Sequence, residues 1–218
     1  MNAVLRRGHR SLGWAVAALS FAAPLSTGAV PVAAAGSSGH VPAAGSAVQV
    51  TATAKNTIPG AGTYLVGKDF NAGVYRSVGN TSCYWERATN AGGSTSSIIA
   101  NDIGSGQRLV YVKPTDKVFK SSGCGTWTRV TAAAMSVKSK KTTIPGNGVY
   151  FVGSDFLPGT YRSTGNTDYC YWERSRSADG ASASTITNEF AKGQLLVTIT
   201  PGGIFQTSGC KTWTRTAG

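Results

Sequence analysis

The sequence predicts an all-β protein that consists of two tandem small antiparallel β-sandwich or barrel modules, each with one disulfide. Three observations lead to this prediction. The chain contains one long stretch twice, short β-branched and aromatic runs alternate with turn residues, and the same two cysteines occur in each copy. No convincing helical periodicity interrupts either copy.

The internal repeat begins at Thr57 and again at Thr143. The first copy starts TIPGAGTYLVGKDFNAGVYRSVGNTSCYWER, and the second starts TIPGNGVYFVGSDFLPGTYRSTGNTDYCYWER. Later, SSGCGTWTRV in the first copy matches TSGCKTWTRT in the second. A repeat of this length is a small domain and not a solenoid unit. We therefore expect one module over 57–130, a linker over 131–142 and a second module over 143–218.

Each copy has six strand signals between turns. They are TYLV, GVYR, CYWER, 107–113, VF at 118–119 and TWTR in the first copy, and their counterparts in the second. In the second copy the turn before GTYR contains Pro158-Gly159, the pair that favours a type I or II turn. Six short strands in so small a module favour an antiparallel sandwich or barrel.

The N-terminus has the layout of a secretory signal peptide. Arginines precede a short apolar run at 14–25, and Ala33-Ala34-Ala35 offers an A-x-A cleavage site. The run is shorter than the roughly 20 residues that a spanning helix needs. We expect a signal peptide at 1–35, cleaved after Ala35, and a flexible segment at 36–56 before the first module. The expected product is secreted, and is either released or held non-covalently at the cell surface.

The four cysteines recur as Cys83 with Cys170 and Cys124 with Cys210. An even count in a secreted chain favours disulfides. Three connectivities are possible, and the duplication selects Cys83–Cys124 and Cys170–Cys210, because each module must have folded alone before it was copied. A small module needs such a link, since its apolar core is modest.

The composition argues against several kinds of function. The two histidines are His9 and His40, so neither module offers a Ser-His or Cys-His nucleophile. Two cysteines without histidine are too few ligands for a structural metal, and we expect no metal, no cofactor and no enzymatic activity. Module 1 has 8 basic and 4 acidic residues, module 2 has 6 and 5, and no nucleic-acid motif is present. Three acids recur, but the sequence places none of them together: Asp69/Asp155, Glu86/Glu173 and Asp102/Glu189.

The repeated pentapeptide CYWER predicts a strand with two different faces. Alternate residues share a face, so Cys83, Trp85 and Arg87 lie on one side and Tyr84 and Glu86 on the other. The side of the disulfide is expected to face the core. The aromatic residues expected to fill the two cores are Trp85, Trp127, Phe119, Trp172, Trp213 and Phe205.

The opposite face is the candidate binding surface. Tyr84 and Glu86, with Tyr75 and Arg76 on a neighbouring strand, form an aromatic and charged patch that suits a sugar ring or a peptide. The patch recurs as Tyr171, Glu173, Tyr161 and Arg162. The alternative is a solvated strand face in which Glu86 and Arg76 form a weak cross-strand pair.

The expected function is binding at the cell envelope or to extracellular glycan, where two weak sites gain avidity on a repetitive polymer. The alternative is a protein–protein module, such as an inhibitor of a secreted hydrolase. Its contact loop is then the variable stretch Ala88–Ser97 or Ser175–Ser184. Cell-wall glycan or an extracellular protein is thus the expected partner, and nucleic acid is not.

The combination G-x-Y-x-V-G-x-D-F-x-x-G-x-Y-R, C-Y-W-E-R and S-G-C-x-T-W resembles a module of secreted proteins and lipoproteins of actinobacteria. The resemblance covers both repeats. It implies an extracellular or surface location in a high-GC Gram-positive bacterium, and it implies no activity. The chain departs from the lipoprotein members because it lacks a cysteine for lipid attachment.

Overall fold

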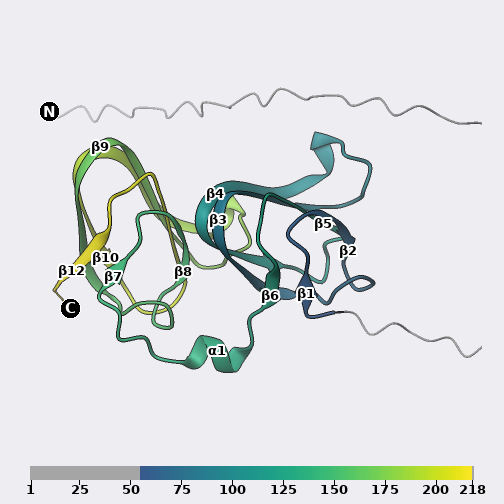
Figure 1. Cartoon of the computed structure of the whole chain (residues 1–218), viewed down its shortest axis with the longest axis horizontal. Coiled ribbons are helices and arrows are strands. Elements are labelled where there is room, and N and C mark those ends of the chain that lie inside the picture. Colours follow the sequence, from purple (N-terminus) through teal and green to yellow (C-terminus); the bar gives the residue numbers. More distant parts are fainter. Residues whose placement is uncertain (1–54, 218) are drawn as a thin grey trace, which may run out of the picture. The chain divides into compact units, whose positions relative to one another are not determined.

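The computed structural model describes residues 55–217 and has the predicted all-β fold (Figure 1). The expected signal peptide at 1–35, and the segment 36–56 except its last two residues, lie outside the described residues. The two repeats form two antiparallel modules with one disulfide each.

Module 1 is organised around its third strand. Its elements are β1 (Thr57–Ile58), β2 (Gly62–Leu65), β3 (Gly73–Ala88), a 3-10 turn (Thr95–Ser97), β4 (Ile98–Val112), β5 (Val118–Ser122) and β6 (Trp127–Arg129). One edge of β3 pairs with β4 along its whole length, and the other edge pairs with β5 and β6. The short strands β2 and β1 extend the sheet beyond β5 and β6.

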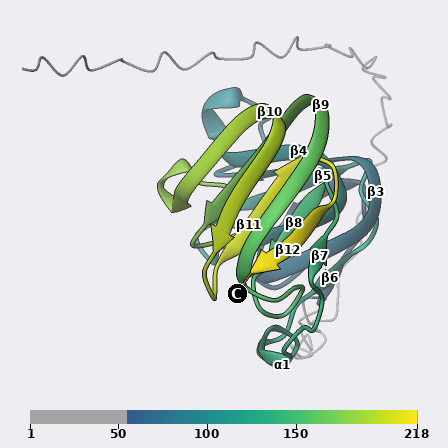
Figure 2. The same ribbon diagram turned by 90° about the vertical axis from the view of Figure 1, so that its left-hand side faces the viewer.

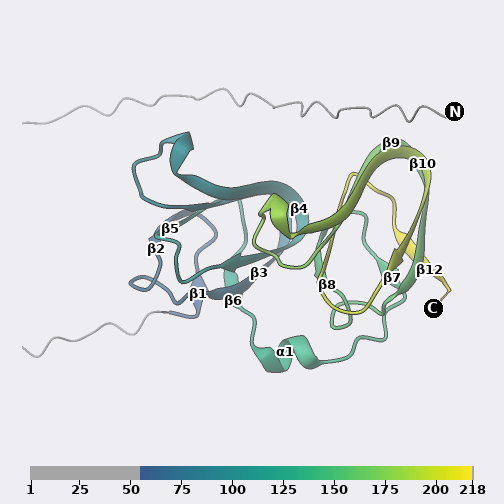
Figure 3. The same cartoon turned by 180° about the vertical axis from the view of Figure 1, so that it is seen from behind.

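Module 2 repeats this arrangement after a short connecting helix, α1 (Ala132–Ser136), which lies within the linker (Figures 1 and 3). Its elements are β7 (Thr143–Ile144), β8 (Gly148–Phe151), β9 (Gly159–Ser175), a 3-10 turn (Ser182–Ser184), β10 (Thr185–Ile199), β11 (Ile204–Ser208) and β12 (Trp213–Ala217). The long strand β9 pairs with β10 on one edge and with β11 and β12 on the other.

The strands are fewer and longer around CYWER than the sequence suggested. GVYR and CYWER are not on neighbouring strands but on one strand, which has 16 residues in module 1 and 17 in module 2. Gly79 and Gly165 allow this, because their φ angles of 71° and 72° bend the strand where other residues rarely adopt such a conformation. Figure 2 shows the curvature of β9 and β10.

An asparagine after each of these glycines fixes the bend. The Asn80 side chain donates to the Gly106 carbonyl at 2.8 Å and accepts from the Gly125 amide at 2.8 Å. Asn166 makes the same pair of bonds, to the Gly193 carbonyl and the Lys211 amide. These bonds satisfy backbone groups that the interrupted ladder leaves unpaired.

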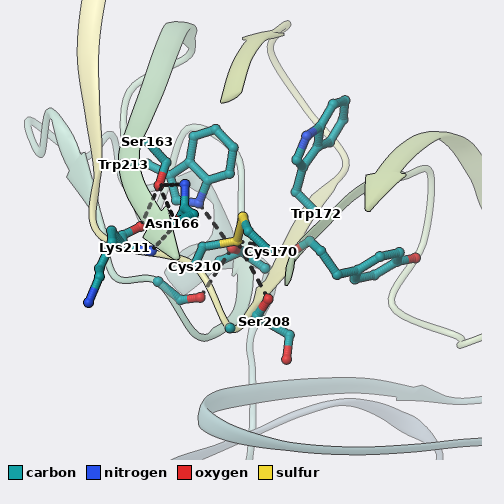
Figure 4. Close-up of a disulfide and its surroundings, with 12 residues drawn as sticks. Ser163, Asn166, Cys170, Trp172, Ser208, Cys210, Lys211 and Trp213 are labelled. Carbon is teal, nitrogen blue, oxygen red and sulfur yellow. Dashed lines mark hydrogen bonds between the residues drawn. A yellow bond between two sulfur atoms is a disulfide. The ribbon is translucent and has the colours of Figure 1, made fainter. Parts of the chain in front are cut away.

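The cores contain the aromatic residues that the sequence assigned to them. Trp127 packs edge-on against Phe119 at 5.6 Å between ring centroids, and Trp213 packs against Phe205 at 5.7 Å. The disulfides are Cys83–Cys124 and Cys170–Cys210, as the duplication predicted. In Figure 4 the indole rings of Trp172 and Trp213 lie on two sides of the second disulfide.

Candidate functional site

The two modules belong to one compact unit, and they share an apolar cluster of Leu109, Val149, Ala178 and Ile204. The contact is also polar. The Arg76 guanidinium of module 1 lies 2.8 Å from the Asp155 carboxylate of module 2. The linker therefore joins two docked domains and not two independent ones.

The loop between β9 and β10 of module 2 covers part of module 1. The Ala178 carbonyl accepts from the Tyr111 amide at 2.8 Å, and the Asp179 carboxylate lies 2.6 Å from the Lys113 ammonium. The Asp179 carbonyl accepts from the buried Arg87 guanidinium. This loop is one of the two stretches that the sequence offered as an inhibitory contact loop, and the structure places it in the module junction.

A cleft of about 410 Å³ opens between this loop and module 1. Its apolar lining includes Leu109, Val149 and Ile204. Its polar and aromatic lining includes Trp85, Asn101, Asp102, Tyr171, Glu173, Asn188 and Gln206. Both modules contribute, so neither module has this cleft alone.

Trp85 is the most distinctive group of the cleft. Its side chain is buried, with 2 % of the residue exposed, and its indole N–H has no hydrogen-bond partner among the described residues. Its counterpart Trp172 donates to the Glu189 carboxylate at 3.0 Å. A buried donor without an acceptor costs roughly 1–3 kcal/mol, so an acceptor that reaches the indole N–H of Trp85 would recover that energy.

The difference between the two tryptophans has a local cause. Asp102 occupies the position of Glu189 with one methylene less, and it is bound by the Arg108 guanidinium. Leu195 stands at the position of Arg108 in module 2. Arg108 therefore binds the Asp102 carboxylate, whereas the corresponding carboxylate of module 2, Glu189, accepts from Trp172.

Two carboxylates from different modules meet in the cleft. Burial raises the pKa of Asp102, the Arg108 charge lowers it, the charge of Glu173 raises it further, and the net direction is upward. Glu173 accepts from the hydroxyls of Tyr171 and Ser175, and from Thr185 at 3.0 Å. Burial, and secondly the hydrogen bond with Glu173, raise the pKa of the Tyr171 hydroxyl, which therefore stays protonated as a donor.

Tyr75 and Tyr161 do not belong to a surface patch, and that part of the prediction is wrong. Both residues are 0 % exposed, and their hydroxyls donate to the carbonyls of Asn71 and Leu157 at 2.6 Å. The reason is that each tyrosine lies on the same strand as CYWER, and on its inner face. The cross-strand Glu86–Arg76 pair of the alternative interpretation does not form either. Arg76 contacts Asp155, and Glu86 lies 3.0 Å from Lys120.

The remaining patch residues divide between the modules. Tyr171 and Glu173 line the cleft, and Arg162 is exposed. In module 1 Glu86 is buried, and the half-buried Tyr84 donates to it at 2.7 Å. The expected two equivalent sites are therefore not equivalent in the structure.

Sequence reasoning missed the cleft because it relied on what the repeats share. The cleft depends instead on where they differ, namely Asp102 for Glu189 and Arg108 for Leu195. The signal available in the sequence was Arg108, a charged residue where the other copy has Leu195. This signal does not show which residues of module 2 lie across the cleft from module 1.

Residues 55–217 contain no group of three or more His, Cys, Asp or Glu side chains with the spacing of a metal site. No helix among them has the length and apolarity to cross a membrane.

Comparison with known proteins gives a match to each of the two repeats. The profile of the Rv1352-like extracellular domain matches residues 56–128 and again 142–214. The uncharacterized proteins Rv1352 of Mycobacterium tuberculosis and Mb1387 of Mycobacterium bovis are each 31 % identical to the chain over 85 residues, which cover 33 % of this chain and 69 % of theirs. No solved structure matches it. The resemblance to an actinobacterial extracellular module is thus confirmed, and the protein is extracellular: the chain belongs to the family of Rv1352-like extracellular domains.

Proposed function

We propose that this protein is a non-enzymatic binding protein that takes a saccharide of the cell envelope, or of extracellular glycan, in the cleft between its modules. The observation that carries the proposal is that Trp85, whose buried indole N–H has no partner among the described residues, lines a cleft together with amides, carboxylates and a tyrosine. The cleft volume falls in the range of roughly 300–1,000 Å³ that small-ligand sites occupy.

The polar groups favour a neutral polyhydroxylated ligand. The indole N–H needs an acceptor, while the side-chain oxygens of Asn101, Asn188 and Gln206 can accept from donors. A sugar hydroxyl is both donor and acceptor, so several hydroxyls on one ring match this mixture. The carboxylates of Asp102 and Glu173 disfavour an anionic ligand.

An exposed aromatic pair supports a polymer as the natural ligand. Tyr169 and Phe190 stack at 4.5 Å between centroids although 55 % and 63 % of these residues are exposed. Phe190 is the strand partner of Tyr171, which lines the cleft. Large apolar groups gathered at the surface often mark a binding site, and these two provide a platform onto which further sugar units extend.

Binding is favoured over catalysis because both carboxylates already have partners. A glycosidase needs one free carboxylic acid and one free carboxylate on the two sides of the scissile bond. Here Asp102 is held by Arg108, and Glu173 accepts three hydroxyl hydrogen bonds. Release of new reducing ends from the glycan during incubation with the protein would contradict this part of the proposal.

The first test compares two equivalent tyrosines in a sedimentation assay with insoluble cell wall. Tyr171→Ala removes a side chain of the cleft and is expected to weaken binding about tenfold, an energy of about 1.4 kcal/mol. Tyr84→Ala removes the half-buried counterpart, which does not line the cleft, and is expected to sediment like wild type. Equal losses in the two variants would place the binding site elsewhere.

The alternative of a protein inhibitor is favoured by one observation, the exposure of residues 89–96 between β3 and β4. Unlike the corresponding loop of module 2, this loop makes no contact with the other module that would bury it. Copurification of a secreted hydrolase, abolished by substitutions in 89–96 and unaffected by Tyr171→Ala, would favour this alternative.

A further inference from the structure

The module junction joins one face of module 1 to a different face of module 2. Each of these faces has an equivalent in the other module that lies outside the junction. We define the front face by Arg76, Gln107 and Leu109 of module 1, and its copy by Arg162, Gln194 and Leu196 of module 2. The back face is defined by Val149, Phe151 and Asp155 of module 2, and its copy by Thr63, Leu65 and Asp69 of module 1. We propose that the unused front face binds the unused back face of a second copy of this chain, head to tail.

The occupied faces show how the contact works. Arg76 donates to both carboxylate oxygens of Asp155, at 2.8 and 3.1 Å. Gln107 donates to the Val149 carbonyl at 2.9 Å and to Asp155 at 3.0 Å. Leu109 is 1 % exposed beneath these polar bonds. An apolar centre under a charge-assisted hydrogen-bonded pair is the anatomy of a specific interface.

The free front face of module 2 presents the same groups in the same register. Leu196 is the strand partner of Arg162, as Leu109 is the strand partner of Arg76. Leu196 is 54 % exposed, and Arg162 and Gln194 are exposed as well. Among residues 55–217, Arg162 has no acidic partner within ion-pair distance. The leucine is buried and the arginine is paired in module 1, whereas both are exposed in module 2.

The free back face of module 1 provides the complement. The Asp69 carboxylate accepts from the Leu65 amide at 2.7 Å, and Asp155 accepts from the Phe151 amide at 2.8 Å. The same turn thus holds both carboxylates in the same local geometry. Asp69 is exposed and Leu65 is 38 % exposed, so an acid and an apolar side chain are available for Arg162 and Leu196.

The contact between chains is expected to be weaker than the contact within a chain. Lys113 and Asp179 form a pair in the junction, but their counterparts are Thr200 and Gly92. Phe151, which lies 5.8 Å beneath the Arg76 guanidinium, is replaced by Leu65. Because the two faces differ, the association is heterologous. The oligomers are therefore expected to grow longer as the protein concentration rises, and not to stop at a two-fold dimer.

The test uses light scattering of the secreted protein over a concentration series. The wild-type mass is expected to rise with concentration. Leu196→Asp destroys the front face and Leu65→Asp the back face, and each is expected to weaken association at least about tenfold. Ile103→Asp is the control, since Ile103 is 65 % exposed and lies on neither face.

Mixing the two variants gives the sharpest result. An equimolar mixture contains one intact front face and one intact back face, so it is expected to form a one-to-one dimer that does not grow. The proposal is overturned if wild type stays monomeric up to its solubility limit, if either variant alone associates as strongly as wild type, or if the mixture stays monomeric. Since none of the three substituted residues, Leu65, Ile103 and Leu196, lines the cleft, failure here leaves the proposed saccharide site standing.

Discussion

Asp116→Ala is expected to lower the free energy of unfolding by about 3–5 kcal/mol, because it leaves a buried guanidinium without its counter-charge. Arg87 and Asp116 lie 2.6 Å apart, and each side chain is 1 % exposed. Asp116 also accepts from the Lys113 amide at 2.7 Å, so the turn before β5 loses a hydrogen bond as well. Denaturation by guanidinium chloride, followed by tryptophan fluorescence, measures the loss.

Two variants serve as controls for Asp116→Ala. Asp168→Ala removes an exposed acid of module 2 and is expected to change stability by less than about 0.5 kcal/mol. Arg87→Met combined with Asp116→Leu removes both charges and is expected to be more stable than Asp116→Ala, since an apolar pair needs no counter-charge. A loss below about 1 kcal/mol for Asp116→Ala would show that water reaches Arg87.

Gly180→Ala is expected to cost about 2–5 kcal/mol, because two separate penalties apply. Its φ of 68° disfavours any residue with a Cβ, at about 1–2 kcal/mol. A Cβ there lies 2.7 Å from Cη2 of Trp85 and 3.2 Å from the Ala100 Cβ, so the loop moves away from module 1 at an overpacking cost of about 1–3 kcal/mol.

Gly93 supplies the matched control for Gly180. It is the counterpart in module 1, with a φ of 75°, and a Cβ on it meets no atom of residues 55–217 within 4 Å. Gly93→Ala is therefore expected to show only the backbone penalty, and the difference between the two variants in chemical denaturation isolates the contact with Trp85. Equal losses would mean that the loop does not press on Trp85 in solution.

The sequence was informative where one module is sufficient to explain a residue. The duplication gave the disulfide pairs, and strand alternation put Cys83, Trp85 and Arg87 on one inner face, where the structure has all three buried. It was misleading for Tyr75, because a glycine bend let one strand run through two segments that looked separate. Local pattern does not show such continuity.

The candidate site could not be predicted because it depends on how two copies dock. Tyr171 and Glu173 were named as site residues, but their partners across the cleft, Trp85 and Asp102, belong to the other module. A repeat comparison treats the modules as equals and selects equal residues. The docked modules are not equivalent. Trp85, which was expected only in the core, also lines the cleft.

The buried indole N–H of Trp85 gives the most direct test that the cleft binds saccharide. The other three tryptophans among residues 55–217 already donate, Trp127 to Ser121, Trp172 to Glu189 and Trp213 to Thr207. In an NMR titration with soluble oligosaccharides released from cell wall, the indole proton of Trp85 is expected to move downfield as it gains an acceptor, while the other three indole signals stay in place. An unchanged Trp85 signal at saturation, or the absence of any saccharide that binds, would contradict the proposed site.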